Sequence, residues 1–107
     1  MAFCDVKNRA KKELLPGLHV QSFWGEQMLV ITVELDEGTA VPEHSHPHEQ
    51  AGTVLAGELS LTIDGETRRL QPGDAYIIPG DVLHSAVAHV PTRLFELFSP
   101  VREEYKF

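Results

Sequence analysis

Short runs of apolar residues alternate with polar residues along most of the chain, from residue 18 to residue 98. In the segment 27–35, Leu29, Ile31 and Val33 are separated by residues that are also largely apolar, so a strand here would be buried on both faces. Further apolar runs occupy residues 19–24, 75–78, 82–90 and 93–98. Their lengths, and the turns between them, predict seven to ten short β-strands.

The strongest local signal is the pair Asp64-Gly65, which stands between alternating runs at 58–63 and 66–70. An Asp-Gly pair favours the positive backbone angles of a type I′ turn, so the two runs are predicted to form a β-hairpin. Further turns are predicted at 71–74 and 79–81, where proline and glycine stand next to aspartate. Because no long helical pattern accompanies these strands, the sequence predicts an all-β, antiparallel barrel or sandwich.

The first residues depart from this β pattern. Residues 5–15 have apolar positions at roughly helical spacing but stop at Pro16-Gly17, which predicts an extended arm or one turn of helix. We therefore expect an N-terminal arm (1–17), one β-barrel domain (18–100) and a C-terminal tail (101–107). A chain of 107 residues with 42% hydrophobic content can build one packed core, which excludes a two-domain enzyme.

The net charge and the single cysteine limit which binding partners and which cellular compartment are expected. The formal net charge is −7, so a nucleic-acid partner is not expected. No apolar run approaches the roughly 20 residues that span a bilayer, and Met1 to Lys12 has no signal-peptide core, so no membrane association is expected. Cys4 is the single cysteine, which favours a reducing, cytoplasmic location. For so small a chain, burial between subunits would add stability, which predicts a homodimer.

Four of the six histidines are candidate metal ligands, namely His44, His46, His48 and His84. Residues two apart on a strand face the same side, so His44 and His46 can point together into a barrel. Pro47 cannot donate to a strand ladder, so His48, Glu49 and Gln50 belong to a bend in which strand alternation does not decide which side chain turns inward. His84, distant in sequence, is the remaining source of a ligand.

Two blocks of the chain share a regular spacing of glycine, proline and histidine: Gly38, His44, His46, Gln50 and Gly57 in the first, and Gly73, Pro79 and His84 in the second. These blocks, separated by the predicted hairpin, resemble the paired motifs of the cupin superfamily. The resemblance covers about residues 27–100 and implies a double-stranded β-helix, the jelly-roll barrel of cupins, in one domain. It also implies a metal site formed by His44, His46, Gln50 and His84, with Glu49 or His48 as substitutes.

The blocks depart from the usual cupin pattern at Gln50, where a glutamate ligand is common, at Asp81, a usual glycine, and at Ala88, a usual asparagine. A neutral amide in place of a carboxylate leaves the metal more electrophilic by one unit of charge, which suits Lewis-acid chemistry. The expected cofactor is one divalent transition metal, for which Mn, Fe, Co, Ni and Zn are all compatible with an imidazole-rich site.

The segment 94–104, and the run His44 to Gln50, resemble a narrower group, the KdgF-type pectin-degradation cupins. Those proteins convert 4,5-unsaturated monouronates into linear keto sugars. Matched position by position, the group's acidic residue falls on Glu96, its aromatic residue on Phe98 and its arginine on Arg102. The resemblance thus implies Glu96 and Arg102 as catalytic residues and Phe98 and Arg102 as substrate-binding residues. The group usually has aspartate in place of Glu96.

The residues themselves support these roles. Glu96 lies on an otherwise apolar strand, on the same face as Leu94 and Phe98, so its carboxylate is expected to be desolvated, with a raised pKa suited to acid/base catalysis. The alternative is a salt bridge to Arg93 or Arg102. Arg102 has a fork of donors that suits a substrate carboxylate, or else it is an exposed tail residue paired with an acidic neighbour, Glu103 or Glu104.

The aromatic residues Phe23, Trp24 and Tyr76 are core or subunit-contact residues or line the pocket, and Tyr76 is a candidate substrate-binding residue. The sequence thus predicts a metal-dependent cupin that binds a small-molecule substrate, a sugar acid, and opens and ketonises an unsaturated uronate. The alternatives are a dioxygenase that uses a redox metal on a small organic substrate, and a non-catalytic cupin that binds a sugar or a metal.

Overall fold

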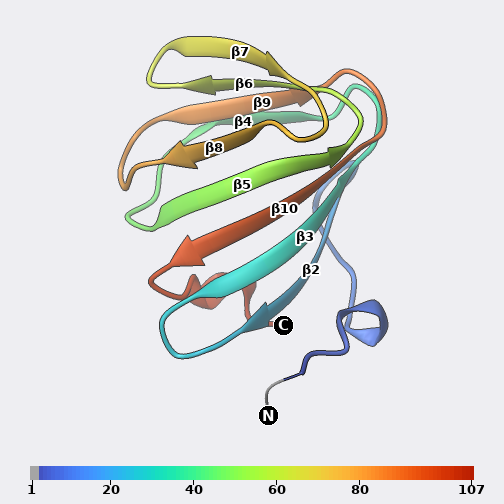
Figure 1. The fold of residues 1–107 in the computed structure, drawn as a ribbon, viewed down its shortest axis with the longest axis vertical. Helices are drawn as coiled ribbons and strands as arrows, with labels where there is room; N and C mark the ends of the chain where they lie inside the picture. Colours follow the sequence, from blue (N-terminus) through green and yellow to red (C-terminus); the bar gives the residue numbers. More distant parts are fainter. Residues whose placement is uncertain (1–2) are drawn as a thin grey trace.

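A computed structural model describes residues 3–107 of the chain. The strands appear in Figure 1. They are β1 (Lys12–Leu15), β2 (Leu18–Trp24), β3 (Leu29–Leu35), β4 (Ala40–His44), β5 (Glu49–Ala56), β6 (Leu59–Ile63), β7 (Glu66–Leu70), β8 (Ala75–Ile78), β9 (His84–Ala88) and β10 (Thr92–Ser99). Two short 3₁₀ turns, Val6–Asn8 and Glu103–Tyr105, lie near the ends. No helix within the described residues is long and apolar enough to cross a membrane.

The strands form two antiparallel sheets that face each other. The six-stranded sheet has the order β1-β2-β3-β10-β5-β8, and the four-stranded sheet has the order β4-β9-β6-β7 (Figure 1). Every strand pairing between neighbours is antiparallel. The predicted all-β, antiparallel fold in a single domain is therefore confirmed.

The core lies between the two sheets and follows from strand alternation. On β10, Leu94, Glu96 and Phe98 are buried, while Arg93 and Phe95 are exposed on the outer face. The inner-face residues of β3 are all buried, but on its outer face only Val30 is buried, while Thr32 is half-buried and Glu34 is exposed. The expectation that this strand is buried on both faces therefore holds only at its start. The inward side chains of β10 therefore project into a cavity between the sheets, which is where the candidate site lies.

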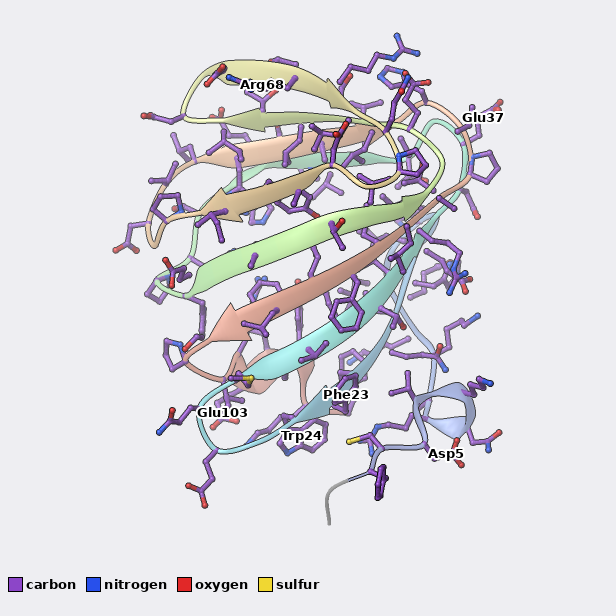
Figure 2. All side chains as sticks on the ribbon, in the orientation of Figure 1. Asp5, Phe23, Trp24, Glu37, Arg68 and Glu103 are labelled. Atoms are coloured by element: carbon purple, nitrogen blue, oxygen red, sulfur yellow. The ribbon has the colours of Figure 1, made fainter. Side chains whose placement is uncertain are left out.

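The hairpin predicted from Asp64-Gly65 joins β6 and β7. Asp64 and Gly65 have φ angles of 50° and 80°, both in the left-handed region that a type I′ turn requires. β6 and β7 are paired in register from Leu59 opposite Leu70 to Ile63 opposite Glu66. Arg68, on β7, is exposed at this edge of the molecule, away from Phe23 and Trp24 (Figure 2).

The segment from Val6 to Leu15 and the C-terminal tail lie against β2 and contact each other. Within the expected N-terminal arm, the structure contains the Val6–Asn8 turn and strand β1, which pairs with β2. The guanidinium of Arg9 donates to the backbone oxygen of Phe107, 3.1 Å away, and lies 4.9 Å from the ring centre of Trp24, at the end of β2 (Figure 2). The C-terminal tail is thereby fixed beside the barrel (Figure 1).

Candidate functional site

Three of the predicted ligands, His44, His46 and His84, converge at one end of the barrel. Their candidate ligand atoms all lie within 4.8 Å of one another. His44 ends β4 and is paired in register with His84, which begins β9. The strand stops at His44, however, so the expectation that His44 and His46 share one strand is wrong. The backbone oxygen of His46 instead accepts a hydrogen bond from the backbone N–H of Asp81, in the β8–β9 turn, at 2.7 Å.

The orientation of the three imidazole rings fits a metal site. In each ring Nδ1 lies at hydrogen-bond distance from a backbone carbonyl, 2.8 Å for His44, 3.1 Å for His46 and 2.8 Å for His84, the carbonyls being those of Pro42, His48 and Val82. A carbonyl can only accept, so the ring proton stands on Nδ1 and Nε2 keeps its lone pair. Nε2 of His84 is buried without a hydrogen-bond partner within residues 3–107. This arrangement, in which a second contact fixes the tautomer, is typical of metal-ligating histidine.

Gln50 supplies a fourth candidate ligand atom. Its Oε1 lies 3.1 Å from Nε2 of His46. Burial lowers the pKa of His46, so the ring is neutral near pH 7 and two lone-pair-bearing atoms face each other. A cation would remove this conflict, because it can accept both lone pairs. Three imidazole nitrogens and one amide oxygen thus fit a divalent transition metal.

Glu49 and His48, the alternatives to Gln50 as a fourth ligand, do not belong to the histidine cluster. Glu49 is exposed at the start of β5, and the cluster of possible ligands in the described chain includes neither Glu49 nor His48. His48 contributes its backbone carbonyl to His46 instead.

Glu96 lies directly behind Gln50, one layer deeper in the barrel. Its Oε2 accepts hydrogen bonds from the Gln50 amide, at 2.8 Å, and from the Tyr76 hydroxyl, at 2.6 Å. Burial raises the pKa of Glu96, although the two hydrogen bonds oppose the shift. Among the described residues no arginine forms a salt bridge with Glu96, so the alternative of a pair with Arg93 or Arg102 is wrong. The carboxylate remains available for proton transfer.

Arg102 lies at the mouth of the same cavity, and its side chain is only 13% exposed. Its guanidinium stacks over the ring of Tyr105, with Cζ 4.1 Å from the ring centre, and Cζ is 5.1 Å from the ring centre of Phe98. Nε also contacts Glu104 at 3.3 Å. Arg102 therefore pairs with an acidic neighbour in the tail, as one alternative expected, but it is not an exposed residue, because it lines the cavity.

Phe98 and Tyr76, expected to bind substrate, both border the cavity. Phe98 is 1% exposed and packs edge-on against His46 and Tyr105. The Tyr76 hydroxyl is already used by Glu96, and burial strongly raises its pKa, so it stays protonated and donates.

The cavity between the sheets has a volume of about 80 Å³. Most of its wall is apolar. The polar side chains that line it are His44, Gln50, Tyr76, His84, Ser85, Glu96, Arg102 and Tyr105. Histidines that could hold a metal, a carboxylate and a cation therefore border the same cavity.

Tyr105 is a site residue that the sequence reasoning missed. It forms the stacking surface for Arg102 and contacts Phe98, although it lies in a tail that had been expected only to follow the barrel. Two aromatic residues, Tyr105 and Phe107, in an otherwise charged segment are the signal that could have indicated a folded tail.

Comparison with known proteins agrees with this architecture. The cupin domain model matches residues 31–98. The pectin degradation protein KdgF of Dickeya dadantii is 31% identical over 84 residues, which cover 77% of this chain and 76% of that protein. The structure of KdgF from a Halomonas species is 31% identical, with a TM-score of 0.90 and 97% of each chain covered. An RmlC-like cupin from Shewanella frigidimarina is 27% identical, with a TM-score of 0.92 over 98% of this chain and 96% of that one.

Proposed function

The chain belongs to the cupin family, and from that membership we propose that it is a metal-dependent enzyme that opens and ketonises 4,5-unsaturated monouronates. Its similarity to proteins named for pectin degradation supports a role in uronate metabolism. The observation that carries the proposal is the position of Glu96, whose buried carboxylate borders the same cavity as His44, His84 and Arg102. A proton-transfer group, a metal-binding cluster and a cation can therefore act on one bound molecule.

In this proposal His44, His46 and His84 would hold one divalent transition metal through Nε2, and Gln50 would hold it through Oε1. When bound, the metal supplies Lewis-acid polarisation of substrate oxygens. Because the Gln50 amide is neutral, the ligand set adds no negative charge, which preserves the electrophilic character of the site. The reaction needs no redox change.

Arg102 binds the substrate carboxylate. Its guanidinium is flattened against Tyr105, which fixes the plane of its donors without consuming them all, and a planar fork matches a carboxylate in two hydrogen bonds. The contact with Glu104 leaves the terminal nitrogens of the guanidinium available. Phe98, beneath the guanidinium, supplies an apolar surface for the sugar ring and excludes water from the histidines.

Glu96 moves the proton. Ring opening removes a proton from the anomeric hydroxyl and breaks the bond between the anomeric carbon and the ring oxygen. The electron pair of the broken bond forms the ketone, and the carbon–carbon double bond takes up one proton at the carbon that becomes CH₂. No atoms are gained or lost. Burial favours the protonated form of Glu96, so it can deliver this proton from within the cavity.

The proposal is tested with purified, metal-replete protein and a 4,5-unsaturated monouronate. Loss of the absorbance of the conjugated double bond gives the rate, and NMR identifies the linear keto acid. We expect conversion faster than the spontaneous reaction, abolished in His44→Ala. The matched control is His19→Ala, since His19 contacts Glu13 on β1 and lies outside the cavity.

Conversion no faster than the spontaneous reaction, in protein shown to hold a metal, would contradict the proposal. Oxygen consumption with an aromatic or diketone substrate would then identify the dioxygenase alternative.

A further inference from the structure

Three residues form a row across neighbouring strands behind the histidine cluster. Glu96 on β10 is paired in register with Gly52 on β5, and Gly52 is paired with Tyr76 on β8. Glu96 and Tyr76 are thus two strands apart, about 9.5 Å at the usual strand spacing. Their side chains nevertheless meet, with the Tyr76 hydroxyl 2.6 Å from Oε2 of Glu96. The Tyr76 side chain must therefore lie across the strand between them.

Gly52 is what permits this contact. A Cβ atom at position 52 would lie 2.4 Å from Cζ and from the hydroxyl oxygen of Tyr76, and 2.5 Å from Cε2. These distances are far inside van der Waals contact, so any side chain at this position would push the ring away from Glu96. Because Gly52 has no side chain, the Tyr76 ring can lie directly over its backbone.

We propose that Tyr76 is a positioning residue that acts on Glu96, through the space left by Gly52, rather than a residue that contacts the substrate. Where it concerns the reaction, this inference rests on the function proposed above. Tyr76 and Gln50 both donate to the same oxygen, Oε2, while no donor within residues 3–107 reaches Oε1. One oxygen of the carboxylate is therefore fixed and the other is free.

Fixing Oε2 has two consequences. The first concerns Gln50, because Oε2 accepts only from the amide nitrogen and so directs the amide oxygen to His46, 3.1 Å away. If Glu96 turned, Gln50 could flip and present its nitrogen, which cannot bind a metal, to the histidines. The second concerns the reaction, because a carboxylate held by one oxygen presents the other at a defined position for proton transfer.

The test uses Co²⁺ as a probe, added to the metal-free full-length protein and followed by its visible absorption. Tyr76→Phe keeps the ring and removes the hydroxyl, whereas Gly52→Ala keeps the hydroxyl and displaces the ring. Loss of an outer-shell partner typically weakens metal binding about 10- to 100-fold, so both variants should raise the dissociation constant of Co²⁺ by about 10-fold or more. The two variants should also change the absorption spectrum in the same way.

The matched control is Gly25→Ala, since a Cβ atom at position 25 meets nothing within 4 Å. Its dissociation constant for Co²⁺ should stay within about twofold of the wild-type value, inside the scatter of unrelated substitutions. If Gly52→Ala fails to fold, Tyr76→Phe alone decides the test. Wild-type affinity and spectrum in a folded Tyr76→Phe variant would overturn the inference, as would a wild-type protein that binds no Co²⁺.

Turnover kinetics distinguish a positioning role of Tyr76 from a role in substrate binding. In Tyr76→Phe we expect kcat for the unsaturated uronate to fall about 10-fold or more while KM stays within about twofold, as for an interaction made only in the transition state. A raised KM with unchanged Co²⁺ binding would assign Tyr76 to the substrate and overturn the inference. Failure of the wild-type protein to convert the uronate would refute the proposed function alone, because Co²⁺ binding is measured without substrate.

Discussion

Replacing Glu96 by glutamine or by leucine separates its chemical role from its structural role. In Glu96→Gln the new amide oxygen can take the place of Oε2 and accept from both Tyr76 and Gln50, so the packing is preserved and only the exchangeable proton is lost. In Glu96→Leu both donors lose their acceptor. Because neither variant has an ionisable group at position 96, the difference in stability between them reports the two hydrogen bonds.

The magnitude follows from the two donors. A buried donor left unpaired costs about 1–3 kcal/mol, so the pair costs about 4 kcal/mol. Burial of the leucine side chain stabilises the variant by about 2 kcal/mol, so the free energy of unfolding of Glu96→Leu should be about 2 kcal/mol lower than that of Glu96→Gln. For a domain of this size that difference corresponds to a Tm about 8 °C lower.

The assay combines thermal unfolding of the metal-free variants with turnover of the unsaturated uronate. Both variants should lose activity by about 10²- to 10⁴-fold, the usual contribution of a general acid or base. A Glu96→Gln variant with wild-type turnover would refute the catalytic role. Equal Tm values for the two variants would refute the claim that Glu96 is the acceptor for both donors.

Two further predictions concern substrate and metal binding. Arg102→Lys keeps the charge but loses the planar fork of donors, so KM for the uronate should rise about 10-fold. The control Arg68→Lys, on the exposed strand β7, should leave KM unchanged. Equal KM values for the wild-type protein and both variants would contradict a role of Arg102 in carboxylate binding. A chelator should abolish turnover and lower the Tm of the wild-type protein, since a metal at 100 times its dissociation constant stabilises by about 2.7 kcal/mol. In His84→Ala the rise in Tm on adding metal should be clearly smaller than in the wild-type protein, and a rise equal to the wild-type value would contradict the assignment of His84 as a ligand.

Local patterns in the sequence were sufficient for much of the fold. The Asp64-Gly65 pair predicted the β6–β7 hairpin because the turn chemistry is contained in two residues. Alternation along residues 93–98 correctly predicted that Glu96 shares the inner face with Phe98. Strand β1 was missed because Lys12–Leu15 shows no alternation, and it is a strand only because β2 offers a free edge.

The parts of the site that sequence could not predict depend on contacts between distant segments. The hydrogen bonds of Glu96 require the register of β10, β5 and β8, which no local pattern specifies. The role of Tyr105 requires the tail to turn back over the barrel mouth, where Arg9 fixes the final residue. His46 lies outside the strand, and its backbone oxygen is bound by the backbone N–H of Asp81 in a turn that is distant in sequence.

The most direct test of the account is the reaction of the metal-replete protein with a 4,5-unsaturated monouronate in D₂O, followed by NMR of the new CH₂ group. If Glu96 delivers the proton inside the cavity, deuterium should enter on one face only, and the product should form faster than in buffer. A product that forms at the spontaneous rate, with deuterium distributed equally over both positions, would contradict catalysis at this site.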